Sequence, residues 1–208
     1  MEAKPSVSPR PYNLGKRREP IDQGRQQILT AARRLLAGTP NYTGFTVDAV
    51  ARQADVARAT VYYQFGSKAG LLEAVCDSLA EAGQMSELAG AFTERDPVEA
   101  LRRFTGCFGR FWGADRAAMR RLRALAALDP DVGAVIAARD RRRREGLTVL
   151  AGRLAGASVL ATGTSHAVPV LFMLTSFETF DTLAGPDQEL TAVVPDVLRL
   201  AEAALRLF

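Results

Sequence analysis

Cysteine and histidine are scarce in this chain of 208 residues, which contains two cysteines and a single histidine. Cys76 and Cys107 match no disulfide or metal-binding spacing, and no secretory signal precedes them, which predicts a reducing, cytoplasmic setting. His166 alone excludes every site that needs two histidines, including the usual zinc and di-iron arrangements. The sequence therefore indicates no metal and no cofactor.

Long apolar runs are also missing. The longest nearly apolar stretch, Ala167–Leu174, is too short to cross a bilayer, so no membrane partner is expected. The apolar share of 48% is nevertheless typical of a globular chain. The length allows one large or two small domains, with a core that needs no metal or disulfide.

Enzyme motifs are missing in any complete form. Residues 163–167, Gly-Thr-Ser-His-Ala, nearly match the nucleophile elbow G-x-S-x-G, but that motif needs a preceding strand and a separate histidine later in the chain. No glycine-rich phosphate loop follows a strand. We therefore expect no enzyme. A helical small-molecule enzyme would need polar groups that converge in a cavity, and the sequence offers few.

What the sequence does contain is a basic N-terminal third. Residues 1–78 hold 11 Lys and Arg against 7 Asp and Glu, a net +4, whereas residues 79–208 hold 16 of each, a net of zero. A basic end on a neutral body is typical of a polyanion-binding segment, most often for nucleic acid. A basic tail that only aids solubility is the alternative that composition leaves open.

The N-terminal third is predicted to hold an arm and several helices. Residues 1–20 contain four prolines and few large apolar side chains, which indicates a disordered basic arm, either reaching along DNA or without a specific role. Helical spacing then predicts a helix over 21–38, ended by Gly38 and Pro40. Its apolar stripe consists of Ile28, Ala31, Ala32, Leu35 and Leu36.

The next segments predict a helix-turn-helix. Thr46 is placed to cap a second helix, and residues 55–57 are long enough only for a tight turn. A third helix, Arg58–Phe65, follows at once and is stopped by Gly66; Ser67 then caps a fourth helix that runs to about residue 83. Two short helices joined by a three-residue turn and braced by a third make this motif.

The third helix is predicted to present an outward face that suits DNA, because Val61 and Phe65 point inward. That face consists of Arg58, Thr60, Tyr62, Tyr63 and Gln64. Arg can pair with guanine, Tyr can contact a thymine methyl or a phosphate, and the other polar side chains, with Lys68, can reach phosphates. Packing of the tyrosines against a neighbouring helix is the structural alternative.

Residues 45–75, FTVDAVARQADVARATVYYQFGSKAGLLEAV, resemble the DNA-binding signature of TetR-family transcriptional regulators. The likeness rests on Phe-Thr-x-x-x-Val-Ala-x-x-Ala, x-Val-x-x-x-Thr-Val-Tyr-Tyr-x-Phe and x-Ser-Lys-x-x-Leu. It implies that the partner is double-stranded DNA with an inverted-repeat operator. Position by position, it implies these DNA-binding residues: Thr46, Arg58, Thr60, Tyr62, Tyr63, Gln64 and Lys68.

Three positions depart from the family pattern. Asp55 stands where a glycine is common, but Asp tolerates a left-handed backbone, so the turn should survive. Ala57 replaces the usual Ser or Thr at the helix cap, at a cost of roughly 1 kcal/mol. Gln64 replaces a frequent histidine as a neutral donor. These changes leave the fold intact and make the half-site sequence hard to derive.

The neutral body is helical in pattern, with segments near 97–113, 115–128, 132–154, 166–184 and 187–207. We therefore predict an all-α chain with the arm (1–20), a helix-turn-helix domain (21–68) and a larger helical domain (69–208). The resemblance implies that this larger domain binds a small molecule and forms a homodimer. The apolar stripes of 166–184 and 187–207 are wide enough for a dimer contact; the alternative is that both helices line the monomer core.

Aromatic residues at 104–112 and a few neighbours form the candidate ligand pocket: Phe104, Cys107, Phe108, Phe111, Trp112, Met119, Met173 and Phe177. Plain core is the alternative for such a stripe. We expect a small apolar or aromatic ligand, because few buried polar candidates are visible. The run Arg139–Glu145 wraps around its helix and is interpreted as a solvated surface with local ion pairs.

Together these features predict a dimeric transcriptional repressor that a small ligand releases from a palindromic operator. The alternative is a ligand-independent regulator, or an activator, whose helical body binds a protein partner. An enclosed apolar cavity in the body would favour the first hypothesis, and a packed body would favour the second.

Overall fold

Helices form all the regular secondary structure that this computed structural model describes, over residues 15–38 and 45–205. These residues contain no strand, which confirms the all-α prediction. Most of the predicted arm, residues 1–14, lies outside the described ranges.

The N-terminal head consists of α1 (Gly15–Gly38), α2 (Val47–Gln53) and α3 (Arg58–Phe65). α1 begins before the predicted helix, so residues 15–20 are helical where the sequence predicts an arm. Periodicity missed this extension because residues 15–20 carry no apolar stripe. Within the head, α1 and α2 pack against each other around Ile28, Leu36 and Val50, all fully buried.

α4 (Lys68–Ala82) joins the head to the body as one unbroken helix, as predicted. It contacts α1 and α3 in the head and α6 and α8 in the body. Its buried side includes Leu71, Leu72, Val75 and Leu79, which belong to a core shared by both parts. α4 therefore connects the packing of the body directly to that of the head.

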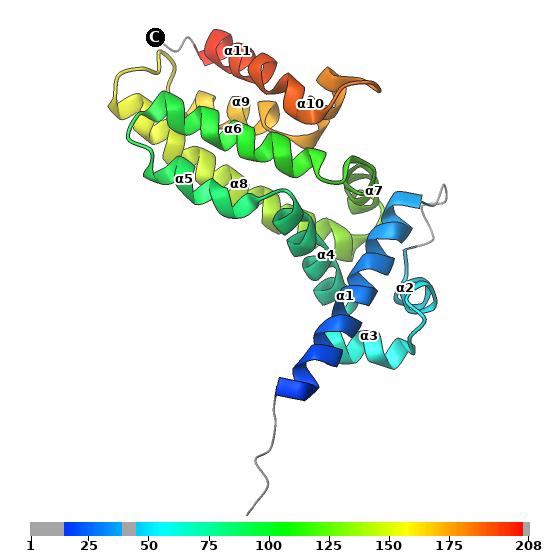
Figure 1. Cartoon of the computed structure of the whole chain (residues 1–208). Coiled ribbons are helices and arrows are strands. Elements are labelled where there is room, and N and C mark those ends of the chain that lie inside the picture. Colours follow the sequence, from blue (N-terminus) through cyan, green and yellow to red (C-terminus); the bar gives the residue numbers. More distant parts are fainter. Residues whose placement is uncertain (1–14, 39–44, 206–208) are drawn as a thin grey trace, which may run out of the picture.

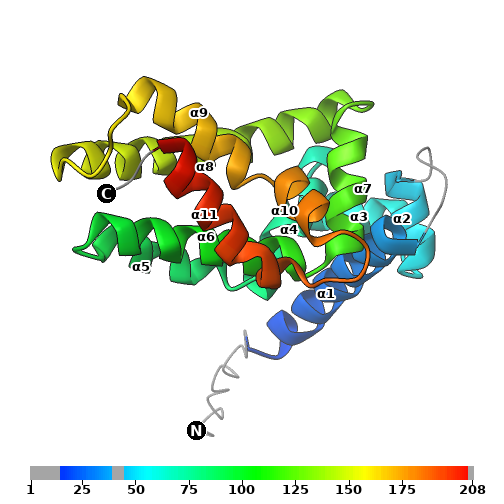
Figure 2. The same cartoon turned by 90° about the horizontal axis from the view of Figure 1, so that it is seen from above.

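In the body the long helix α8 runs beside α6 and α9 (Figures 1 and 2). The α-helices of the body are α5 (Leu88–Thr93), α6 (Pro97–Gly113), α7 (Arg116–Ala126), α8 (Pro130–Gly156), α9 (Thr164–Leu174), α10 (Phe177–Ala184) and α11 (Val194–Leu205). Short 3-10 helices lie at Met85–Glu87 and Leu190–Val193. α6, α7 and α8 begin at Asp96, Asp115 and Asp129, whose carboxylates accept hydrogen bonds from the first backbone N–H groups.

Two predicted helices of the body differ in the structure. The predicted helix 166–184 is two helices, because the Ser176 side chain accepts a hydrogen bond from the Thr179 N–H and starts α10 anew. The predicted helix 187–207 begins with a 3-10 turn before α11. α5 was not predicted at all, since six residues are too short for a clear period.

By length and apolar character, no single helix among residues 15–38 and 45–205 could span a membrane; only α9 and α10 reach these criteria as a pair, which is bent by 53°.

Candidate functional site

The helix-turn-helix is held by local contacts that its sequence specifies. Thr46 Oγ1 accepts a hydrogen bond from the Ala49 N–H at 3.1 Å, and Ser67 Oγ accepts one from the Gly70 N–H at 3.0 Å. Asp55 has a left-handed backbone with φ of 50°, as expected of this position in the turn. Ala57 caps α3 without a side-chain hydrogen bond, which confirms the missing cap.

The outward side of α3 carries the residues that the sequence placed there. Tyr63 is 81% exposed and Tyr62 is 38% exposed, whereas Val61 is buried beneath them. Phe65 is held on the inner side by Arg25, whose guanidinium carbon lies 4.4 Å from the ring centroid. Thr60 and Gln64 are half-buried, so they contribute less to the exposed surface of α3 than the tyrosines do. We call Arg58, Thr60, Tyr62, Tyr63 and Gln64 the α3 face.

Arg58 is already engaged within the head. It donates to Asp48 Oδ2 on α2 at 3.2 Å and to the Tyr62 hydroxyl at 3.3 Å, and its guanidinium lies 5.4 Å from the Tyr62 ring centroid. The hydrogen bond to Tyr62 and the Asp48 carboxylate raise the pKa of Arg58 above its ordinary value. Asp48 and Tyr62 together hold this guanidinium in place on the outward side of the head.

Lys68 differs from its predicted role as a free phosphate ligand. Its ammonium forms an ion pair with Asp129, the N-cap of α8, and both side chains are only 26% exposed. The hydrogen bond from Lys68 lowers the pKa of the Asp129 carboxyl, and the N–H groups of Asp131 and Val132 act in the same direction. Lys68 thus ties the start of α4 to the body and needs to leave Asp129 before it can meet a phosphate.

The body contains a cavity of about 310 Å³ bounded by α4, the 3-10 turn, α5, α6 and α8. We call it the aromatic cavity. Its apolar wall includes Met85 and Leu88 and five aromatic rings: Phe92, Phe104, Phe108, Phe111 and Trp112. Neighbouring rings of this set lie in contact, with Phe104 and Phe108 centroids 4.8 Å apart and Phe111 and Trp112 centroids 4.6 Å apart.

Four of the eight predicted pocket residues line the aromatic cavity: Phe104, Phe108, Phe111 and Trp112. Met119 lines a separate void of about 30 Å³ beside it, together with Phe111 and Trp112. Phe177 packs against Trp112 at 5.9 Å between centroids and supports the wall without lining it. Cys107 is buried elsewhere, with its sulfur 3.3 Å from an Arg110 nitrogen.

Met173 does not belong to the cavity, and this prediction was wrong. Its side chain is 57% exposed on α9. Leu171 and Leu174 of the same helix are buried, so α9 turns Met173 away from the core. Spacing alone grouped it with Phe177, but the break after Thr175 puts the two residues on different helices.

Sequence reasoning missed the charged residues of the cavity, which are Arg139, Asp140, Arg142 and Arg143 on α8. The interpretation of this run as a solvated surface fails for Arg143, which is only 4% exposed. A signal was present: Val135, Leu147, Leu150 and Leu154 form the inner stripe of α8, and residue 143 lies on it, four positions before Leu147.

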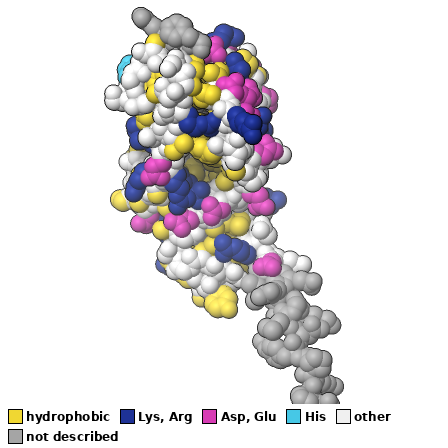
Figure 3. Space-filling model, turned by 90° about the vertical axis from the view of Figure 1, so that its left-hand side faces the viewer, with side chains coloured by type: hydrophobic (Ala, Val, Ile, Leu, Met, Phe, Trp, Pro, Cys, Tyr) yellow, Lys and Arg dark blue, Asp and Glu magenta, His cyan; other side chains and the backbone are white. Residues whose placement is uncertain are grey.

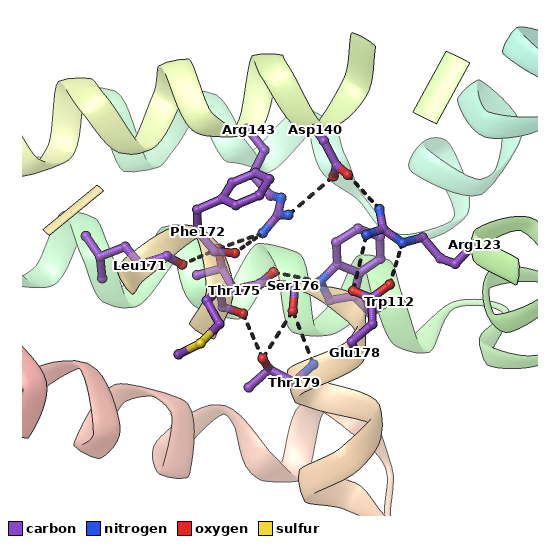
Figure 4. A network of polar contacts seen from close by, with 11 residues as sticks. Trp112, Arg123, Asp140, Arg143, Leu171, Phe172, Thr175, Ser176, Glu178 and Thr179 are labelled. Atoms are coloured by element: carbon purple, nitrogen blue, oxygen red, sulfur yellow. Dashed lines mark hydrogen bonds and ion pairs between the residues drawn. The ribbon is translucent and has the colours of Figure 1, made fainter. Parts of the chain in front are cut away.

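Arg143 belongs to a polar network that joins α6, α7, α8, α9 and α10 (Figure 4). Asp140 accepts from Arg143 at 3.3 Å and from Arg123 at 2.9 Å, and Arg123 also pairs with Glu178 at 2.7 Å. Trp112 donates its indole N–H to the Thr175 carbonyl at 3.1 Å, and Arg143 donates to the Thr175 hydroxyl at 3.0 Å. Trp112 is therefore fixed at the junction between the cavity and the α9–α10 break.

The near match to a nucleophile elbow falls at the start of α9, where Gly163 is the N-cap and Ser165 and His166 are exposed. A helix start provides neither the strand nor the strained turn that the elbow needs. Among the described residues, no group of three or more His, Cys, Asp and Glu side chains could hold a metal ion.

Comparison with known proteins agrees with this geometry. Residues 28–75 match the family model described as "Bacterial regulatory proteins, tetR family". No curated protein matches the sequence.

Many solved structures share the fold. A TetR family transcriptional regulator, PfmR from Thermus thermophilus, is 21% identical with a TM-score of 0.62, and the match covers 87% of this chain and 98% of that one. A putative fatty acid metabolism regulator of Clostridium perfringens is 21% identical with a TM-score of 0.64, covering 86% and 97%. FadR from Bacillus subtilis, solved with stearoyl-CoA, is 17% identical with a TM-score of 0.66, covering 86% and 98%.

The helix-turn-helix lies in the segment that matches the family model, and the helical body behind it has the fold of the regulators named above. Residues 28–75 therefore form a helix-turn-helix DNA-binding segment of the TetR family, and the solved structures show that the whole chain shares the fold of these regulators.

Proposed function

We propose that this protein is a cytoplasmic, homodimeric repressor of an inverted-repeat operator, and that a small molecule in the aromatic cavity releases it from DNA. In this proposal residues 21–68 read DNA, and residues 69–208 bind the ligand and form the dimer. No step of the mechanism is catalytic, and none uses a metal or cofactor.

The α3 face would lie in a major groove, with Thr46 at a phosphate beside the start of α2. Tyr63 has the exposure needed to reach a base or phosphate without moving, and Arg58 would turn from Asp48 toward a guanine. Lys68 would exchange the Asp129 carboxylate for a phosphate. The Lys68 exchange replaces one anionic partner by another, so the charge of its ammonium stays compensated, whereas Arg58 would exchange a carboxylate for the neutral acceptors of guanine.

The dimer would form across α9 and α11, which contact each other and carry exposed apolar side chains at Met173 and Leu200. Most of the predicted α11 stripe, including Val197, Ala201 and Leu205, packs inside the monomer instead. The interface would therefore use the opposite edge of the helix. A two-fold axis there sets two heads at a fixed spacing, which suits a palindromic site.

The observation that carries the proposal is the position of the aromatic cavity between α4 and α8. Ala80 of α4 and Arg139 to Gly146 of α8 both border it. The same two helices meet again at the head, through Lys68 and Asp129. A ligand that separates α4 from α8 would change this second contact, and thereby the spacing of the heads, if it binds one arrangement more tightly.

The alternative was a ligand-independent regulator or activator with a protein partner. A cavity of about 310 Å³ lies within the range typical of ligand sites, which favours the induced repressor. The fatty-acid regulator and the stearoyl-CoA complex among the structural neighbours support a small-molecule ligand in the same way.

The proposal is tested by selecting random duplex DNA with the purified full-length protein at near-physiological salt. We expect enrichment of an inverted repeat, and occupancy of that repeat upstream of a reporter should lower transcription. Enrichment of a single half-site would contradict recognition by a dimer, and raised transcription would contradict repression. Salt-sensitive binding without sequence enrichment would count against specific recognition by the free protein.

A further inference from the structure

The aromatic cavity holds more positive charge than its own acid can neutralise. Arg139, Arg142 and Arg143 line it with one carboxylate, Asp140, a formal excess of two positive charges. Asp140 is shared between Arg143 and Arg123, and Arg139 pairs at 2.6 Å with Asp77, which does not line the cavity. Among the described residues, Arg142 has no carboxylate partner.

Arg143, at the polar end of the cavity, has a buried hydrogen-bond donor without a partner in the described part of the chain, which is a second observation about the ligand. It donates to the Phe172 carbonyl at 2.7 Å and to the Thr175 hydroxyl at 3.0 Å, and its guanidinium lies 4.0 Å from the Phe172 ring centroid. Its Nε is buried and has no hydrogen-bond partner among the described residues. Such donors are rare in native proteins, because burial without an acceptor is unfavourable. A ligand oxygen that reached Nε would supply the acceptor that this donor lacks.

The opposite wall is apolar. Phe92, Phe104, Phe108 and Phe111 present ring surface, and Met85 and Leu88 extend it. On the face of the molecule seen in Figure 3, hydrophobic side chains lie in a hollow bordered by Lys and Arg side chains. This combination disfavours cations, which the arginines repel, and it disfavours sugars, whose hydroxyls need more partners than rings provide.

We propose that the ligand is an organic carboxylate with an apolar body. The inference rests on the proposed function of the cavity and names its ligand class. The carboxylate lies at the arginines of α8, within reach of Arg142 at the rim, and the apolar body lies against the aromatic rings. The volume of about 310 Å³ suits a medium-length acyl chain or a bicyclic aromatic acid rather than an entire coenzyme A thioester.

Trp112 provides the assay, because it is the only tryptophan of the chain and lines the cavity. Its fluorescence is titrated with decanoate and 1-naphthoate, with the neutral 1-decanol and 1-naphthalenemethanol, with decylamine and with decanoyl-coenzyme A. We expect the two carboxylates to bind about 10- to 100-fold more tightly than their neutral counterparts, the range typical of a charge-assisted hydrogen bond.

Two variants of α8 make the test specific. Arg142→Gln should weaken the carboxylates at least tenfold and leave the alcohols unchanged, because it removes only the charge at the rim. Arg141→Gln is the matched control, since Arg141 is exposed on the same helix and does not line the cavity. Circular dichroism of both variants verifies that the fold is intact.

Several outcomes would overturn the ligand class. They are equal binding of acids and alcohols, tighter binding of decylamine or of the coenzyme A thioester, an unchanged affinity in Arg142→Gln, or no response of Trp112 to either acid. Release of the selected operator is measured in parallel. If an alcohol binds and releases DNA as well as its acid, the ligand class fails and induced repression stands. If an acid binds selectively without releasing DNA, induction fails and the ligand class stands.

Discussion

At the scale of single residues, the α3 face depends on Tyr62 in two ways. Its ring packs under the Arg58 guanidinium, and its hydroxyl accepts a hydrogen bond from Arg58. Tyr62 therefore orients the side chain that we expect to read guanine, in addition to the DNA contact that we propose for Tyr62 itself.

Replacing Tyr62 should separate recognition from stability. We expect Tyr62→Ala to weaken binding to the selected operator by roughly 1–3 kcal/mol, with little change in Tm because the ring is partly exposed. Tyr62→Phe keeps the ring beneath Arg58 and should lose less binding free energy. Fluorescence anisotropy on a labelled operator measures both. Unchanged affinity in Tyr62→Ala would remove this residue from the interface.

Cys76 gives a prediction about pH. Burial raises the pKa of its thiol from 9.0 to about 11. The folded state then holds the thiol proton more tightly than the unfolded state does. The contribution of this proton to the free energy of unfolding is therefore fully present below pH 9 and is lost as the pH rises toward 11. At pH 8 the thiolate fraction is about a hundredfold smaller than in the unfolded chain.

Alkylation by iodoacetamide at pH 8, followed by peptide mass mapping, measures this protection directly. The folded protein should react at Cys76 at least a hundredfold more slowly than the protein in urea, since the thiolate is the reacting form. Reaction at the same rate in both states would show that this helix opens freely.

At the scale of elements, α4 and α8 meet at both ends of the proposed signal path. The ion pair of Lys68 and Asp129 joins their first turns, and the aromatic cavity separates their later turns. Asp129 also caps α8 through Oδ1, so Asp129→Asn can remove the charge and keep the cap.

Asp129→Asn should free Lys68 for phosphate. We expect tighter binding to all DNA sequences at an unchanged slope of log K against log salt, because Lys68 meets the phosphate in both complexes. Lys68→Ala should weaken binding and make the slope shallower by about one unit, and the double variant should resemble Lys68→Ala alone. Salt titrations of the four proteins measure this. If Asp129→Asn acts equally with and without Lys68, the ion pair does not control DNA binding.

At the scale of the whole molecule, the dimer proposal rests on apolar side chains that the monomer leaves exposed on α9 and α11. Met173 is 57% exposed and Leu200 is 44% exposed. Leu128, at 69%, is the most exposed leucine among the described residues and follows α7, away from both helices in sequence. It serves as a matched control.

Met173→Lys and Leu200→Lys should each prevent dimerisation, because they place a charge in a contact that must lose its water. At micromolar concentration we expect light scattering to give the monomer mass of 22.4 kDa for these variants, and twice that mass for the wild type and Leu128→Lys. Operator affinity should fall in the two variants that no longer dimerise and stay unchanged in Leu128→Lys. A dimeric Leu200→Lys variant would place the interface elsewhere.

The sequence by itself determined the helix-turn-helix, because its signals act over a few residues. The cap at Thr46, the left-handed turn at Asp55 and the stop at Gly66 each depend on the local backbone. The helical pattern similarly allowed α6 to be predicted with its bounds.

Only the tertiary structure decided which partners the charged side chains find. Lys68 and Asp129 are 61 positions apart, and Arg143 meets Thr175 32 positions away, so no local pattern relates them. Arg143 is charged yet buried, since hydrogen bonds and aromatic rings from α6 and α9 replace its water. The α3 face therefore depends largely on consecutive residues, whereas the cavity and its link to the head exist only after distant helices pack.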